Sequence, residues 1–219
     1  MNPPLDGTKL ALVEAAGPLF AEHGLEGTSI RAIAERAKAN VAAVNYHFGS
    51  KENLYTEVLR HVATRAMRRP VADYRTEAEA NRSRRDLSRL MAEFMSDWFH
   101  SYFPPEGPAW HVRLMMRTLL EPSPSLQQIV DQVFRPDHSE LEGLLRAVCP
   151  GMTEEQARFC AFTLSAQITF FIMAKAPILL FLRMRDYDPA FLDSACGHVT
   201  RVVFAMLRDY GAPITLPAT

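Results

Sequence analysis

Apolar residues recur at three- and four-residue steps along nearly the whole chain, which is the spacing of one face of an α-helix. The segment from Leu87 to Tyr102 shows this clearly, with apolar side chains at positions 87, 90, 91, 94, 95, 98 and 102. We find no convincing alternation of apolar and polar residues, the pattern typical of a half-buried β-strand. The pattern therefore predicts an all-α protein.

Capping residues predict where several of these helices begin and end. Ser50 is placed to cap a helix, and Thr153 forms a capping box with Gln156. Asp188-Pro189 combines an N-cap with a first-turn proline, and Gly211 is expected to end the same helix.

Prolines predict irregular points. Pro18 lies inside the first expected helix, where its ring clashes with the preceding turn, so we expect a kink near Ala15 or a late restart of the helix. Ser123-Pro124 is expected to open a helix, Pro136 to interrupt it, and Pro177 to break a later apolar helix.

The segment 40–48 is too short for a core helix and has an unusual surface. Val44 and Phe48 form one apolar edge at helical spacing, which leaves small and polar side chains facing outward. These suit a base-pair edge, because alanine lets a helix approach closely, asparagine pairs with adenine, and a tyrosine hydroxyl reaches a phosphate. The expected outward-facing residues are Ala42, Ala43, Asn45 and Tyr46.

A second short helix precedes this one. The segment 28–37 is expected to form a capped helix with Ile30, Ile33 and Ala34 buried, followed by a tight Lys38-Ala39 connection. Two short helices joined in this way make a helix-turn-helix, whose second helix reads the major groove of DNA.

The order of these residues resembles the DNA-binding domain of TetR-family regulators, over about the first quarter of the chain. The stretches that carry the resemblance are Leu12–Ala16, Leu19–Gly24, Thr28–Ile30, Ile33-Ala34 and Tyr46–Tyr55. The segment Asn40–Phe48 is similar to one subgroup, that of the cephalosporin and chloramphenicol regulator. The segments Glu121–Leu126 and Phe134–Pro136 resemble the effector domain of that subgroup more loosely.

This chain has Lys38 where the family usually has a glycine in the turn. A left-handed conformation at that position would cost about 1 kcal/mol for a residue other than glycine. The turn is therefore expected to be reshaped.

The predicted DNA contacts come from both short helices and the residues that flank them. The expected reading surface is Val41, Ala42, Ala43, Asn45 and Tyr46, with phosphates held by Thr28, Ser29, His47 and Lys51, and with Arg31, Lys38 and Asn40 completing the interface. The chain has a net charge of −1, so affinity for DNA must come from a local basic face. The alternative is that these charges are ordinary solvated side chains.

The composition, 48% apolar and 22% charged, is ordinary for a folded soluble protein, and 219 residues can hold one large or two small domains. A polar stretch from 70 to 85 suggests a boundary. We therefore expect a three-helix helix-turn-helix domain, a linking helix, a C-terminal helical ligand-binding and dimerisation domain, and a tail. Their expected ranges are 1–50, 51–69, 70–211 and 212–219.

The N-terminus lacks a basic-then-apolar leader, so we expect a cytoplasmic protein. The segment 168–182 is interrupted by Lys175 and Pro177 and is too short to span a bilayer, so no membrane association is predicted. Cys149, Cys160 and Cys196 have no CxxC spacing and are expected to be core thiols, with a redox sensor as the alternative.

The helix expected from Thr153 to Ala176 is apolar on all sides and must be enclosed. Either a partner subunit or the core of the same chain can enclose it. The resemblance implies a homodimer that pairs this helix with the one from Pro189 to Arg208. The predicted interface residues are Phe162, Ile172, Val199, Val203, Phe204 and Leu207.

Aromatic, methionine and polar side chains on the middle helices can line a pocket or fill a core. The resemblance favours a pocket for a small hydrophobic effector, with a polar or anionic handle held by Arg113, Arg117 or Gln167. These polar residues can also reach outward or pair with Glu121. The predicted lining is Phe94, Trp98, Trp110, Arg113, Met116, Arg117, Gln167, Phe170 and Met173.

No HExxH, nucleophile-elbow or glycine-rich phosphate motif is present, so we predict no catalytic residue, no cofactor and no resident metal. Spacing alone leaves open a metal-sensing site built from His100, His111 and either Asp137 or His138. The sequence thus predicts a ligand-responsive regulator, usually a repressor, that a small effector releases from a palindromic operator on double-stranded DNA. The alternatives are a small-molecule-sequestering protein with a vestigial helix-turn-helix, and a helical enzyme.

Overall fold

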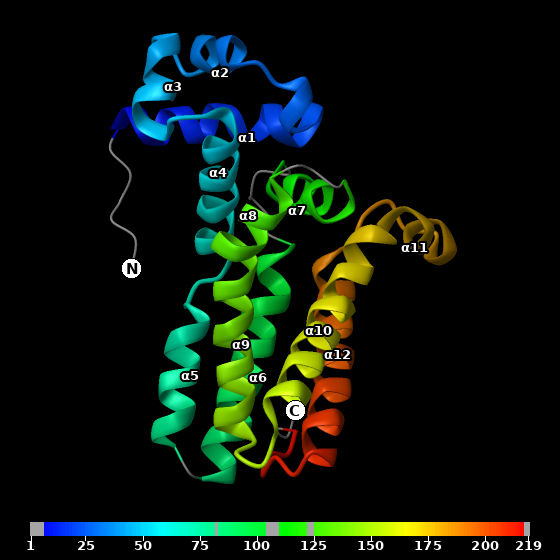
Figure 1. Cartoon of the computed structure of the whole chain (residues 1–219). Helices are drawn as coiled ribbons and strands as arrows, with labels where there is room; N and C mark the ends of the chain where they lie inside the picture. Colours follow the sequence, from blue (N-terminus) through cyan, green and yellow to red (C-terminus); the bar gives the residue numbers. More distant parts are fainter. Residues whose placement is uncertain (1–6, 82, 104–109, 122–124, 217–219) are drawn as a thin grey trace. The chain divides into compact units, whose positions relative to one another are not determined.

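The computed structural model describes residues 7–81, 83–103, 110–121 and 125–216. Across these ranges the regular elements are helices and no strand occurs, which confirms the predicted all-α fold (Figure 1). The helices are α1 Gly7–Gly27, α2 Ile30–Arg36, α3 Val41–Phe48, α4 Lys51–Ala66, α5 Val71–Ala80, α6 Arg84–Ser101, α7 Trp110–Leu120, α8 Leu126–Ile129, the π-helical turn η1 Val130–Phe134, α9 Arg135–Val148, α10 Glu154–Met173, α11 Lys175–Leu182 and α12 Pro189–Asp209.

The chain divides into two compact units. Unit 1 comprises Met1–Arg65 and Pro105–Arg135, and unit 2 comprises Ala66–Pro104 and Pro136–Thr219. The sequence placed all of 70–211 in one C-terminal domain. The structure differs because α7, α8 and η1 share a hydrophobic core with the helix-turn-helix.

The core of unit 1 joins the three N-terminal helices to α4 and α7. Phe20 of α1 is fully buried and meets the ring of Tyr55 edge-on, with 4.9 Å between ring centroids. Leu114 of α7, Ile129 of α8 and Val133 of η1 are buried in the same cluster. The helix-turn-helix therefore rests on residues from the middle of the sequence as well as on its own.

The core of unit 2 is built around α6, which packs against α5 and α12. Apolar side chains of α9 and α10 complete the same cluster. By length and composition α12 could cross a bilayer, but Val199, Val203 and Leu207 are buried in this core. That burial is what a core helix of a globular domain shows.

The predicted caps are confirmed. The side chain of Ser29 accepts from the backbone N–H of Ala32 at 3.1 Å, and that of Ser50 accepts from Asn53 N–H at 3.1 Å. Thr153 and Gln156 form the reciprocal capping box, and the side chain of Asp188 caps α12. These helices begin where side-chain chemistry alone predicted.

The prolines behave differently from expectation. Helix α1 continues through Pro18, and its break lies at Gly24, where φ is 71°. Pro177 sits inside α11, and the preceding break falls at Ala174, with α10 and α11 meeting at 64°. The polar stretch after Pro70 forms α5. The Ser123-Pro124 signal lies outside the described residues.

Candidate DNA-binding surface

The turn between α2 and α3 is tight and left-handed. Lys38 has φ 52°, the conformation expected to strain a residue other than glycine, and its N–H donates to the Glu35 carbonyl at 3.1 Å. Asn40 Oδ1 accepts from Ala42 N–H at 2.9 Å and so caps α3. The turn is therefore left-handed with a lysine in it, at a cost of about 1 kcal/mol, and the expectation that it would be reshaped is wrong.

The two sides of α3 differ as predicted. Val44 and Phe48 are buried in the core of unit 1. On the opposite side Tyr46 is 85% exposed, Val41, Ala42 and Asn45 are also exposed, and Ala43 and His47 are half-buried. A capped helix that presents small, amide and phenol groups to solvent has the shape and the chemistry of a base-reading element.

The expected phosphate contacts need one correction. Ser29, Arg31 and Lys38 are exposed and free to face a backbone. Thr28 is only 3% exposed, and its hydroxyl donates to the carbonyl of Gly24 at 2.7 Å, so this hydroxyl holds the end of α1. In the sequence, Gly24 four residues earlier was the indication that Thr28 has a structural role, because a glycine can adopt the positive φ that turns the chain there.

Lys51 also has an internal contact. Its Nζ donates to the backbone carbonyl of Thr28 at 3.1 Å, which places the ammonium beside the start of α2. The two remaining N–H groups of the ammonium can still donate to a phosphate. Lys51 therefore links the two helices of the motif while keeping its charge at the predicted interface.

Two predicted effector contacts instead join α7 to α1. A Cβ at Gly17 would overlap the ring of Trp110, so glycine at this position is what lets α7 approach α1. Arg117 Nη1 donates to the carbonyl of Glu22 at 3.0 Å, and its Nε lies 2.7 Å from Glu121. Trp110 and Arg117 are thus packing and bridging residues of unit 1.

The remaining predicted effector residues do not form one lining. Phe94 and Trp98 lie in the core of unit 2 with stacked rings 5.5 Å apart, so they fit the alternative of core filler. On α7, Arg113 is exposed and Met116 is half-buried. On α10, Gln167 is half-buried, whereas Phe170 and Met173 are exposed.

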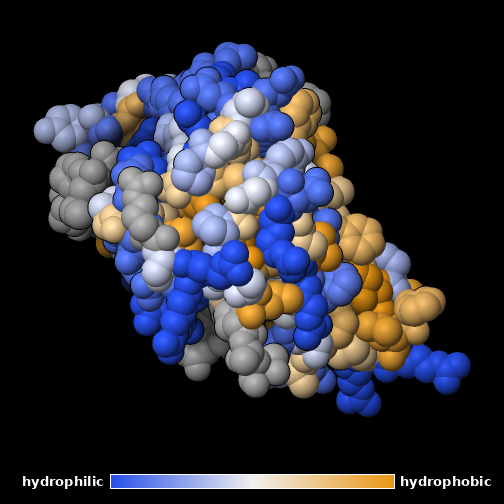
Figure 2. Space-filling view, turned by 90° about the horizontal axis from the view of Figure 1, so that it is seen from below, coloured by the Kyte–Doolittle hydropathy of each residue, from blue (hydrophilic) through white to orange (hydrophobic). Residues whose placement is uncertain are grey.

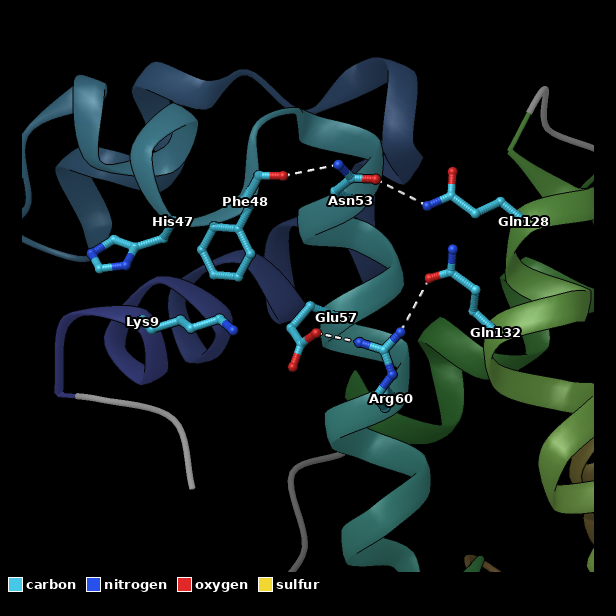
Figure 3. A pocket seen from close by; sticks show the side chains of 8 residues that line it. All are labelled: Lys9, His47, Phe48, Asn53, Glu57, Arg60, Gln128 and Gln132. Atoms are coloured by element: carbon cyan, nitrogen blue, oxygen red, sulfur yellow. Dashed lines mark hydrogen bonds and ion pairs between the residues drawn. The ribbon is translucent and has the colours of Figure 1, made fainter. Parts of the chain in front are cut away.

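A pocket in unit 1 lies between the N-terminal part of α1, the end of α3, α4 and the α8–η1 segment (Figure 3). Amides and charges dominate its walls, so it differs from the apolar effector site that the sequence predicted. Its lining residues are Lys9, His47, Phe48, Asn53, Glu57, Arg60, Gln128 and Gln132.

The predicted dimer interface is corrected by burial. The α12 residues chosen for it are packed inside unit 2, with Val199, Val203, Phe204 and Leu207 at most 1% exposed. Their packing agrees with the alternative that these four residues belong to the core of their own chain. Of the other two, Phe162 is exposed and Ile172 is half-buried.

A different apolar surface is exposed on unit 2. Along α10 it contains Phe159, Phe162, Phe170 and Met173, and on α11 it contains Leu180 and Phe181, with Phe181 87% exposed. Figure 2 shows hydrophobic side chains gathered at the end of the molecule where α11 lies. The signal in the sequence was a second apolar stripe on α10, opposite its buried one.

The cysteines and histidines lie apart. Cys149, Cys160 and Cys196 are free and buried, and burial raises the pKa of each thiol, which makes a reactive thiolate unfavourable. His100 Nε2 lies 3.2 Å from Asp193 Oδ1, and His138 lies 4.0 Å from Glu142. The described residues contain no cluster of three or more His, Cys, Asp or Glu side chains suited to a metal ion.

Two family models match the chain. The model of bacterial regulatory proteins of the tetR family matches residues 12–58, and that of the C-terminal domain of the HTH-type transcriptional dual regulator CecR matches residues 84–208. CecR of Shigella flexneri is 29% identical over 178 residues, which is 78% of each chain. An HTH-type transcriptional repressor of Mycobacterium tuberculosis is 48% identical over 58 residues. That match spans 26% of this chain and about a third, 31%, of the repressor.

Solved structures show the same fold. NalD, the secondary repressor of the MexAB-OprM multidrug efflux pump in Pseudomonas aeruginosa, superposes with a TM-score of 0.62 at 24% identity and covers 93% of this chain and 97% of its own. A transcriptional regulator from Aquifex aeolicus gives 0.57 at 18% identity, covering 91% and 99%. Because the CecR-type model also spans more than half of the sequence, this chain belongs to the TetR family of transcriptional regulators and carries a C-terminal domain of the CecR type.

Proposed function

We propose that this chain is a dimeric transcriptional regulator, acting in the cytoplasm as a repressor, that binds a palindromic operator and leaves it when a small hydrophobic effector binds unit 2. The observation that carries this proposal is the exposed face of α3. Asn45 and Tyr46 are exposed on a helix fixed by the Asn40 cap at one end and by the buried Phe48 at the other. A side chain held on a rigid, capped helix can specify a base with little loss of conformational entropy.

Residues on α3 and around it have separate roles in this proposal. Asn45 pairs with an adenine edge, and the methyls of Ala42 and Ala43 approach thymine methyl groups. Arg31, Lys38 and Lys51 supply the positive charge that meets phosphates. Because the chain has a net charge of −1, this local basic face supplies the affinity that the whole molecule does not.

The partner subunit is proposed to cover the exposed stripe of α10. Helix α12 is proposed to lie beside α10 in the same interface. Phe159, Phe162 and Phe170 are apolar side chains exposed on one long helix, and a twofold contact would bury this stripe against the same stripe of the partner. The two reading helices would then face successive major grooves, about 34 Å apart.

The effector acts only through its preference between two states of the dimer. A hundredfold loss of operator affinity requires about 2.7 kcal/mol of differential binding to the state that does not fit DNA. Gln167, which is half-buried on α10, supplies one polar contact for such a ligand.

The test begins by selecting operators from a random DNA pool with the purified full chain. Selected sites should be palindromic, and Asn45→Ala should relax base preference at one position per half-site, at a cost of about 1 to 3 kcal/mol. Thr76→Ala, an exposed residue of α5, serves as the control variant and should bind like wild type. Failure to enrich any sequence would favour the sequestering protein with a vestigial motif.

A further inference from the structure

The last turn of the reading helix is held by a short chain of side-chain hydrogen bonds that begins in α8. Gln128 Nε2 donates to Asn53 Oδ1 at 2.9 Å, and Asn53 Nδ2 donates to the backbone carbonyl of Phe48 at 2.9 Å (Figure 3). Both ends of the Asn53 amide are therefore used. Because the amide is planar, a shift of Gln128 reorients the donor that holds Phe48.

A second connection lies on the next turn. Arg60 of α4 donates from Nη2 to Gln132 Oε1 at 3.2 Å, while its Nη1 pairs with Glu57 (Figure 3). Gln128 and Gln132 are four residues apart, so they lie on the same side of the α8–η1 segment. Two glutamines thus fix the rotation of this segment about its own axis against α4.

These polar links set orientation more than stability. Cohesion between the segment and the rest of unit 1 comes from Ile129 and Val133, which are buried in its core. Asn53 is exposed and Gln128 is half-buried, and a neutral hydrogen bond that competes with water contributes only about 1 kcal/mol. Loss of the link should leave the unit folded while freeing the end of α3.

The segment is also irregular where the chain passes from unit 1 to unit 2. The N–H of Arg135 donates to the carbonyl of Val130, five residues back, so η1 is a π-helical turn. Pro136 explains it, because proline has no N–H and its ring clashes with the carbonyl four residues earlier, that of Gln132. A π-turn carries one extra residue and commonly marks a functional position in a helix.

The π-helical turn adjoins unit 2 along the chain. The helical run continues from η1 into α9, which belongs to unit 2 from Pro136 onward. Each residue of an α-helix advances it by about 100°, so a one-residue change in the extent of the π-turn would rotate Gln128 and Gln132 away from α4.

We propose that Asn53 and Gln128 are positioning residues for operator binding, and that a change of helical register at η1 withdraws Gln128 and releases the end of α3. The proposal rests on the proposed function for its consequence on DNA. The link is formed by residues far from the bases, so its loss weakens binding to every sequence without changing base preference.

The decisive measurement is hydrogen–deuterium exchange of the free protein, which requires neither operator nor effector. Gln128→Ala should raise exchange three- to tenfold in peptides that cover 41–49, and Asn53→Ala should do the same. Gln127→Ala is the matched control, since Gln127 is exposed on the same turn and its side chain donates to Asp131 of the adjoining η1 at 2.8 Å, away from Asn53. If Gln128→Ala and Gln127→Ala exchange alike, the link does not position α3 and the proposal is overturned.

Operator affinity then separates this proposal from the proposed function. On a selected operator Gln128→Ala should bind three- to tenfold more weakly than wild type, with unchanged base preference, and should add nothing to Asn53→Ala in a double mutant. Independent, additive losses would contradict the link. If no operator can be selected but α3 still exchanges faster in Gln128→Ala, the proposed function fails while the positioning contact stands.

Discussion

The exposed surface of α3 in unit 1 and that of α10 and α11 in unit 2 are both helical, but their chemistry is opposite. On α3 the exposed groups are small methyls, an amide and a phenol, and the backbone is fixed by side-chain caps. On α10 and α11 they are mainly phenylalanines and leucines. The first surface suits a hydrated, charged partner read through hydrogen bonds, and the second suits a dry contact, because exposed apolar area of this kind is stabilised when it is covered.

The largest effect is expected from removing a buried side chain in the core of unit 2. This change tests whether α12 packs inside unit 2, beneath its exposed apolar surface. Phe204 is fully buried, so Phe204→Ala should lower the free energy of unfolding by about 3 to 5 kcal/mol through lost burial and a cavity. Val202→Ala, on the outward side of α12, should cost under about 1 kcal/mol. Urea denaturation followed by circular dichroism measures both, and equal costs would show that Phe204 does face outward.

Placing charges on the exposed apolar stripe of α10 tests whether that stripe forms the subunit interface. The double variant Phe162→Glu with Phe170→Glu should remain folded, run as a monomer in analytical ultracentrifugation, and lose about a hundredfold in operator affinity, since one half-site no longer assists the other. The matched control replaces both residues with leucine, which keeps an apolar surface. A glutamate variant that stays dimeric would place the interface elsewhere.

A smaller effect is expected at the edge of the reading surface. Lys51→Ala should weaken binding to all sequences several-fold and reduce the slope of log affinity against log salt by about 1, because one phosphate contact is lost. Lys51→Arg keeps the charge and should retain the slope. A salt titration by fluorescence anisotropy compares the variants, and an unchanged slope in Lys51→Ala would remove this residue from the phosphate contacts.

The smallest effect concerns pH in the core of unit 2. Burial, the charge of Asp97 and the hydrogen bond from Tyr74 to Asp97 together raise the pKa of Tyr74 to about 12. The folded state thus holds the phenol proton more tightly than the unfolded state, whose pKa is near 10. The resulting stability is complete below pH 10 and is lost as the pH rises toward 12. Tyr74→Phe should flatten this alkaline decline in urea midpoints measured from pH 8 to 12, and an equally steep decline would assign it to another group.

Local chemistry could be predicted from the sequence, whereas the choice of partner for each apolar stripe could not. The caps at Ser50 and Thr153 and the two sides of α3 depend on residues within one or two turns, so their signals are complete in the sequence. The stripe of α12 was identified correctly as apolar, but periodicity does not say whether Phe204 meets its own core or another subunit. In the structure Phe204 is buried in the core of unit 2.

Long-range packing accounts for the remaining differences between the sequence predictions and the structure. Nothing in the sequence near Trp110 indicates that its ring lies against Gly17, almost a hundred positions earlier. The same holds for the link between Gln128 and Asn53, two amides that look like ordinary surface residues in isolation. The break in α1 could have been read from Gly24, but the stronger helix-breaking tendency of Pro18 concealed it.

The contact between Trp110 and Gly17 has a practical consequence for spectroscopy. The chain has two tryptophans, and they fall in different units, Trp110 in unit 1 and Trp98 in the core of unit 2. Replacing either with phenylalanine leaves a single indole whose emission reports on one unit. A pair of such variants, heated or mixed rapidly with denaturant, would show whether the two units melt together or in sequence.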